Sequence, residues 1–224
     1  MNLKNKSIVV LLSGGLDSST VTGIAKQSKA KIFGLSFDYG QRHKKELNSA
    51  LIISKHFEIE EFKVVTLDLS LWGGSSLTDN EKNIPTDGIQ TNTIPNTYVP
   101  GRNTIFISVA LSYAEAINAD FIGLGVNALD YSGYPDCRPD YIKKFQELAY
   151  LANKRGKENN PIKLWTPLID LNKEEIIELA FETNVPIKKT WSCYAGNSKP
   201  CGICDSCRIR ETAYKKWLKN KNNK

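Results

Sequence analysis

Long apolar segments are absent from this chain of 224 residues. No apolar run approaches the roughly 18 residues that a membrane-spanning helix needs. The amino terminus has a basic start, but only about five apolar residues follow it and no small-residue cleavage site comes after them, unlike a secretion signal. The sequence therefore predicts a cytoplasmic protein with no membrane partner.

Two familiar phosphate-binding patterns are also missing, because the sequence contains neither G-x-G-x-x-G nor G-x-x-x-x-G-K-[ST]. Internal repeats are absent as well. The formal net charge of +6 is weak evidence for nucleic-acid binding, because five lysines lie among the last ten residues with no acid between them. Such tails are usually solvated, so we expect no nucleic-acid partner.

The most informative stretch that is present is the loop Ser13-Gly14-Gly15-Leu16-Asp17-Ser18. It follows the apolar run 8–12 and precedes a predicted helix at 18–28, so it offers backbone N–H groups at a helix start to an anion. The glycines allow a tight turn, and the hydroxyls add donors. Asp17 would repel a phosphate chain unless a cation such as Mg²⁺ lay between them. The alternative is a plain turn with an Asp near a helix start.

The apolar periodicity predicts an α/β fold with a doubly wound, mostly parallel sheet. Predicted strands are 7–12, 31–37, 62–67 and 119–126, with a short extended piece at 164–170. Predicted helices are 18–28, 43–57, about 103–118, 140–154, 173–183 and 208–218. Asn103 or Thr104 can cap the third helix, and Asn172 with Glu175 forms a capping box for the fifth. The irregular stretch 70–98 is either a functional lid or disordered.

Polar and aromatic side chains crowd the run 127–139, which follows a predicted strand. Ligands of parallel sheets bind beyond the carboxyl ends of the strands, so this run suits a flat heterocycle with polar edges. Tyr131 or Tyr134 would stack on the ring, and Asp130 or Asp136 would pair with ring N–H groups. The alternative is a hydrogen-bonded turn. Arg102, at the start of the third helix, can hold a carboxylate or a phosphate.

Four of the five cysteines fall within fifteen residues, with the spacing C-x7-C-x2-C-x2-C. Four thiolates complete a tetrahedral zinc shell without an open position, which is typical of a structural site. An iron–sulfur cluster and disulfides are the alternatives. We expect residues 1–186 to form the α/β domain and residues 187–224 to form a zinc-binding segment with a helix. The ligands are Cys193, Cys201, Cys204 and Cys207, whereas Cys137 stands alone.

Five runs together resemble one family of the ATP pyrophosphatases, the 7-cyano-7-deazaguanine synthases. They are Ser13–Ser18, Phe37-Asp38-Tyr39-Gly40-Gln41-Arg42-His43, Tyr98-Val99-Pro100-Gly101-Arg102-Asn103-Thr104, Asp130-Tyr131-Ser132-Gly133-Tyr134-Pro135-Asp136-Cys137-Arg138, and Thr190-Trp191-Ser192-Cys193-Tyr194 with the later cysteines. The resemblance implies the adenine-nucleotide alpha-hydrolase type of fold. It also implies a ligase that uses ATP and ammonia to convert 7-carboxy-7-deazaguanine into the nitrile, through an adenylated acid and an amide.

The resemblance also implies roles for individual residues. Asp17, near Mg²⁺, and Arg102 would be catalytic. ATP would be bound by Leu12, Ser13, Gly14, Gly15, Leu16, Asp17, Ser18, Ser19 and Thr20. The deazaguanine substrate would contact Arg102, Asp130, Tyr131, Tyr134, Asp136 and Arg138, and the four clustered cysteines would bind zinc. A homodimer is compatible with the family. The nearest alternative is an ATP pyrophosphatase that thiolates or aminates a tRNA base, although the chain has no room for a large RNA-binding domain. A non-enzymatic zinc module is a second alternative.

Overall fold

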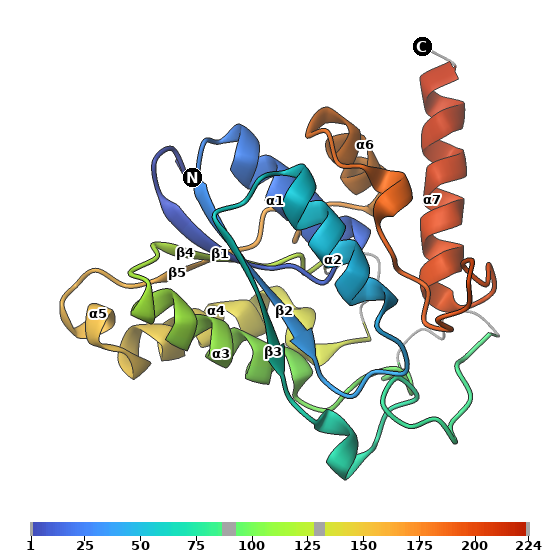
Figure 1. The fold of residues 1–224 in the computed structure, drawn as a ribbon, viewed down its shortest axis with the longest axis horizontal. Helices are drawn as coiled ribbons and strands as arrows, with labels where there is room; N and C mark the ends of the chain where they lie inside the picture. The colour runs from blue at the N-terminus through green and yellow to red at the C-terminus, as the bar shows by residue number, and fades with distance from the viewer. Residues whose placement is uncertain (1, 87–92, 128–132, 223–224) are drawn as a thin grey trace.

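A computed structural model describes residues 2–86, 93–127 and 133–222 of the chain. Its centre is a five-stranded sheet in the order β3-β2-β1-β4-β5, in which every neighbouring pair is parallel (Figure 1). This confirms the predicted doubly wound α/β fold. The strands are β1 (Ser7–Leu11), β2 (Lys31–Asp38), β3 (Glu61–Thr66), β4 (Phe121–Gly123) and β5 (Lys163–Trp165).

Helices cover both faces of the sheet (Figure 1). One face carries α1 (Leu16–Gln27), α2 (Lys45–His56) and α6 (Lys173–Glu182), and the other carries α3 (Arg102–Ala116) and α4 (Pro139–Ala152), followed by the short α5 (Lys154–Lys157). The last helix, α7 (Asp205–Asn222), packs against α6, where the rings of Phe181 and Trp217 stack with their centres 4.4 Å apart. Short 3-10 turns are η1 (Leu69–Trp72), η2 (Pro135–Cys137) and η3 (Ile187–Lys189). Among the described residues, no helix is both long and apolar enough to cross a bilayer.

The central strand β1 is buried on both of its faces, as expected for a parallel sheet under two helix layers. Val9 packs in the apolar cluster that α3 and α4 complete, whereas Ile8 and Val10 pack with α1, α2 and α6. Ala213 of α7 belongs to the second of these clusters. The segment 187–224 thus shares the core of the body, and the proposed boundary at residue 186 stays a prediction.

Two local predictions differ from the structure. The strand predicted at 119–126 is regular only over Phe121–Gly123. Beyond it, the chain at Gly125 passes close to the start of α1, where a Cβ atom would lie 2.9 Å from the backbone nitrogen of Ser18. The predicted cap of α3 by Asn103 or Thr104 is wrong. Gly101, in the left-handed conformation, is the N-cap residue. The side-chain amide of Asn103 instead donates to the backbone carbonyl of Asp136 at 3.2 Å. The capping box of Asn172 and Glu175 is confirmed.

The described parts of the stretch 70–98 fold back onto the body. The Arg42 guanidinium donates to the carbonyls of Asp79, at 2.5 Å, and of Lys82. The Ser76 amide donates to the Asn96 carbonyl at 2.8 Å, which joins the two ends of the stretch. Residues 87–92 lie outside the described part, and the proposed lid stays a prediction.

Candidate functional site

A cavity of about 350 Å³ opens at the carboxyl ends of β1 and β4, where the strand order reverses. Open parallel sheets bind ligands at this point. A second cavity of about 550 Å³ lies between α4 and the start of β5, and is lined by residues such as Tyr150, Leu151 and Pro161. It lies far from the phosphate loop and faces the amino end of a strand. We therefore place the functional site in the first cavity.

The predicted phosphate loop supplies one wall of this cavity, through Ser13, Gly15, Leu16, Asp17 and Ser18. No side chain caps the start of α1, so the positive end of the helix is open to an anion. Gly14 has a φ of +79°, and a Cβ atom there would collide with the backbone of α2 at Glu46. A glycine is therefore required where the loop passes α2.

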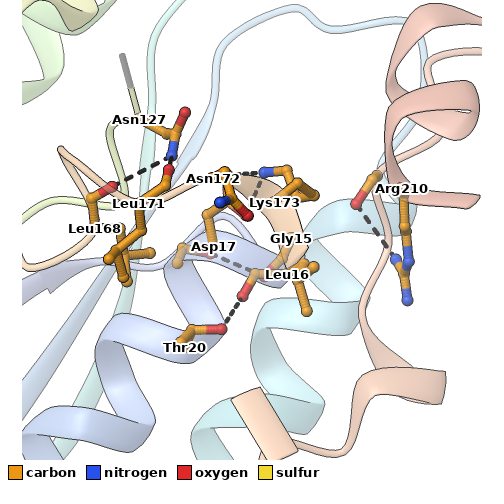
Figure 2. A network of polar contacts seen from close by, with 12 residues as sticks. Gly15, Leu16, Asp17, Thr20, Asn127, Leu168, Leu171, Asn172, Lys173 and Arg210 are labelled. Atoms are coloured by element: carbon orange, nitrogen blue, oxygen red, sulfur yellow. Dashed lines mark hydrogen bonds and ion pairs between the residues drawn. The ribbon is translucent and has the colours of Figure 1, made fainter. Parts of the chain in front are cut away.

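Four residues of the predicted ATP-binding stretch lie outside the cavity wall: Leu12, Gly14, Ser19 and Thr20. The Leu12 side chain is buried in the core. The Ser19 hydroxyl donates to the Gly15 carbonyl at 2.6 Å. The Thr20 hydroxyl donates to the Leu16 carbonyl at 2.9 Å (Figure 2). Both hydroxyls are thus bound within their own helix.

Asp17 lies in the first turn of α1 and faces a cation. Lys173, the first residue of α6, places its Nζ atom 2.8 Å from both carboxylate oxygens (Figure 2). The capping box of α6 fixes the place from which Lys173 reaches Asp17. The site therefore balances the Asp17 charge with a flexible ammonium group, which is also able to contact a phosphate.

Two further polar groups hold the α6 side of the cavity in place. The Asn127 amide, which follows β4, donates to the carbonyls of Leu168, at 3.2 Å, and of Leu171 (Figure 2). Arg210 of α7 lines the cavity and donates to the Ile187 carbonyl at 2.8 Å. Burial lowers the pKa of Arg210, which remains a cation at neutral pH because its ordinary pKa is so high.

The cavity wall also carries Arg102, Tyr39, Tyr134 and Glu46. The Arg102 guanidinium lies 5.8 Å from the centre of the Tyr39 ring. The Tyr134 hydroxyl hydrogen bonds to the Thr97 hydroxyl at 2.8 Å. Burial raises the pKa of the Glu46 carboxyl to about 7, although Arg102 and a hydrogen bond from Gln41 act in the opposite direction. A cation and a carboxylate therefore face the same aromatic-lined space.

The structure separates the other predicted substrate contacts. Asp136 is buried and lies outside the cavity wall. Its carboxylate accepts a hydrogen bond from the backbone N–H of Asn103, in the first turn of α3, at 3.1 Å. It thus holds the first turn of the helix that carries Arg102. Arg138 is exposed and immediately precedes α4. Asp130 and Tyr131 lie outside the described residues.

The four clustered cysteines meet at one point. Their sulfur atoms all lie within 4.8 Å of one another, and the Sγ atoms of Cys201 and Cys207 are 4.0 Å apart. A tetrahedral ion with Zn–S bonds of about 2.3 Å places its sulfurs about 3.8 Å apart. Backbone N–H groups of Ala195 and Cys201 point at the Cys193 sulfur at 3.4 and 3.3 Å, which suits a thiolate. All five cysteines are free thiols, so the disulfide alternative is wrong.

The family model described as queuosine biosynthesis protein QueC matches residues 7–218. The chain belongs to this family. It is 86% identical over 224 residues to a 7-cyano-7-deazaguanine synthase of Prochlorococcus marinus strain MIT 9301, with all of both chains covered. It is 60% identical over 207 residues to the 7-cyano-7-deazaguanine synthase of strain NATL2A, with 92% of each chain covered. The chain is thus a member of an enzyme family.

The structure of NMN synthetase from Francisella tularensis is similar in fold, with a TM-score of 0.50 at 15% identity over 89% of this chain and 71% of that one. The match to the QueC family covers both the sheet and the cysteine segment, and it confirms the resemblance inferred from the motifs. Sequence reasoning missed several cavity residues that come from distant parts of the chain, namely Glu46, Lys173, Trp191, Tyr194 and Arg210.

Proposed function

We propose that this protein converts 7-carboxy-7-deazaguanine and ammonia into 7-cyano-7-deazaguanine at the expense of ATP. The observation that carries the proposal is the convergence of the phosphate loop with Arg102, Lys173 and Arg210 on one cavity at the strand ends. Three cations around a helix start suit the phosphates of ATP and a substrate carboxylate. The names of the 7-cyano-7-deazaguanine synthases supply the identity of the product, and the resemblance of the motifs implies the 7-carboxy-7-deazaguanine substrate.

The reaction needs two activations of the same carbon. A substrate carboxylate oxygen attacks the α-phosphorus of ATP, and pyrophosphate leaves from the loop at Ser13–Ser18. Ammonia then attacks the acyl carbon, and AMP leaves with the electron pair of the broken C–O bond, which gives the amide. The amide oxygen then attacks the α-phosphorus of a second ATP and pyrophosphate leaves; loss of AMP, with the electron pair of the C–O bond, and of the two nitrogen-bound protons leaves the nitrile. The chain contributes positioning and charge stabilisation at each step.

We assign the phosphate contacts to Ser13, Gly15 and Ser18 with Lys173 and Arg210. Asp17 would bind Mg²⁺ once the Lys173 ammonium moves from the carboxylate to a phosphate, since Mg²⁺ bridges carboxylate and phosphate oxygens. Arg102 would neutralise the substrate carboxylate or the α-phosphate. Tyr134 lies on the same wall and would pack against the deazaguanine ring.

We also propose that the cysteine cluster binds one zinc ion, because four sulfurs this close surround a single ion. Zinc would hold the segment that supplies Ser192, Tyr194, Ser206 and Arg210 to the cavity. We propose that the protein acts in the cytoplasm on a free small molecule, without a nucleic-acid or membrane partner, and that its family is compatible with a homodimer.

A mass-spectrometric turnover assay tests the proposal. Purified protein would be incubated with ATP, Mg²⁺, ammonium and 7-carboxy-7-deazaguanine. We expect the nitrile to accumulate together with AMP. If the acid is untouched although ATP binds, the substrate assignment is wrong, and a tRNA substrate becomes the next to try. If only the amide forms, the second activation is wrong.

A further inference from the structure

Glu46 lies in the first turn of α2 and faces the cavity. Among the described residues, the carboxylates that line this cavity are Asp17 and Glu46. Both oxygens of Asp17 are taken by Lys173. The two carboxylates therefore differ in their surroundings, since Asp17 belongs to the phosphate loop and is paired with Lys173, whereas Glu46 lines the cavity together with aromatic residues.

A fixed hydrogen-bond relay positions the Glu46 carboxylate. Gln41 donates its side-chain amide to Glu46 Oε1 at 3.0 Å and to the Phe37 carbonyl at 3.1 Å. The carbonyl oxygen of the same Gln41 side chain accepts from the Tyr39 amide nitrogen at 2.6 Å. Gln41 is thus locked to the end of β2 and presents its NH₂ group to Glu46. A carboxylate has about four acceptor positions, so this relay leaves most of them for a ligand.

Arg102 lines the same cavity as Glu46 and carries the opposite charge. Among the described residues, the Arg102 guanidinium forms no ion pair with Glu46 at 4.0 Å or less. Its charge nevertheless lowers the pKa of the Glu46 carboxyl. A donor group and an acceptor group therefore face the same space without satisfying each other. Rings of Tyr39, Tyr134, Phe106 and Trp191 line that space as well. Such a wall matches a flat ring with acceptors and donors on its edge.

We propose that Glu46 accepts hydrogen bonds from the N1–H and 2-amino groups of the deazaguanine ring, and so selects a 2-aminopyrimidinone. This inference rests on the proposed function. The sequence analysis suggests Asp130 or Asp136 for this role. Asp130 lies outside the described residues, and the Asp136 carboxylate accepts from the Asn103 backbone amide and lies outside the cavity wall. A guanine-type ring carries two neighbouring donors on one edge, and a carboxylate accepts from both, whereas a neutral amide accepts from one and opposes the other.

The ionisation of Glu46 fits this role. Burial raises the pKa of the free carboxyl to about 7, and two ring donors would stabilise its charged form. The ionisable groups that interact with Glu46 are Arg102 of α3 and Tyr39, which follows β2. Lys45, the neighbour of Glu46 in α2, instead places its ammonium group over the Trp191 ring, 4.9 Å from the ring centre. The substrate therefore binds the deprotonated form, and its affinity falls as pH drops below about 7.

The test compares two substrates in two proteins. Equilibrium binding by calorimetry and steady-state turnover would be measured for 7-carboxy-7-deazaguanine and for its analogue without the 2-amino group. The wild type should bind the analogue roughly tenfold to a hundredfold more weakly, the usual effect of an unmade hydrogen bond to a charged group. E46Q should weaken binding of the full substrate by a similar factor and lose most of the discrimination. E60Q, which changes an exposed carboxyl in the same way, should match the wild type.

Two outcomes would overturn the assignment. Equal discrimination in E46Q and the wild type would remove Glu46 from ring recognition. A fall in kcat with unchanged affinity for both compounds would instead make Glu46 a proton acceptor in the chemical steps. In either case the wild type still turns over the acid, so the proposed function survives. A wild type without turnover of the acid would refute the proposed function itself.

Discussion

Replacing Glu46 by Gln should change the pH dependence of folding, independently of any ligand. The carboxyl has a pKa of about 7 in the folded protein against an ordinary value of 4.5, because burial disfavours its charge. A raised carboxyl pKa means that the unfolded chain ionises first, so the folded state loses stability as pH rises through this window. At about 1.4 kcal/mol per pKa unit, the penalty is about 3 kcal/mol above pH 8 and about 1 kcal/mol at pH 5.

The assay is chemical unfolding of wild type and E46Q at several pH values between about 5 and 8.5. Gln keeps the size and the hydrogen bond with Gln41 but has no charge to desolvate. The free-energy difference between the two proteins should therefore shift by about 2 to 3 kcal/mol in favour of E46Q from the acid to the alkaline end. Titration of the cysteine thiols is common to both proteins and cancels in the difference.

A constant difference across this pH range would refute the reasoning, because it would mean that Glu46 titrates alike in the folded and unfolded states. A shift of the opposite sign would mean that Arg102 dominates over burial and holds the carboxylate charged. E60Q serves as the matched control. Its carboxyl is exposed, and its stability difference from the wild type should stay flat with pH.

Three further changes test other parts of the site. D17N should lower turnover roughly 10² to 10³-fold with unchanged zinc content and circular dichroism, and near-normal turnover would exclude Asp17 from the mechanism. C204A should remove bound zinc, measured by metal analysis, and lower the free energy of unfolding by several kcal/mol, whereas full retention of metal would contradict the four-sulfur site. D136N should destabilise the protein by about 1 to 2 kcal/mol in denaturant titration, because the Asn103 amide of α3 loses a charged acceptor, and an unchanged midpoint would argue against that role.

Local sequence patterns predicted much of the fold. The apolar strand before the loop at Ser13 and the capping box at Asn172 are properties of neighbouring residues, and both appear in the structure where they were expected. The first residues of the helices were predicted less accurately. The helix expected from residue 18 begins at Leu16, because the backbone of the loop continues straight into the helical turn, and this places Asp17 in the first turn.

The site residues that the sequence did not predict were missed for one physical reason. Lys173 and Asp17 are 156 positions apart, and they meet only because α6 packs beside α1 on one face of the sheet. Glu46 reaches the cavity because Gly14 lets α2 approach the phosphate loop. No local pattern records either contact. Asp136 shows the converse case, since its motif suggested a ligand contact while its carboxylate is used by a neighbouring helix.

The cysteine segment is joined to the phosphate loop by direct contacts, and this links metal binding to the site. The Trp191 amide donates to the Gly14 carbonyl at 2.9 Å, inside the loop itself. His43 bonds the Cys193 carbonyl at 3.0 Å, and a Cβ atom on Gly196 would collide with the His43 ring. The cysteine cluster, the loop and the start of α2 therefore form one packed unit. Because Gly14 also sets the approach of Glu46, we expect loss of the metal to disturb the phosphate loop and the part of the cavity wall around Glu46 first.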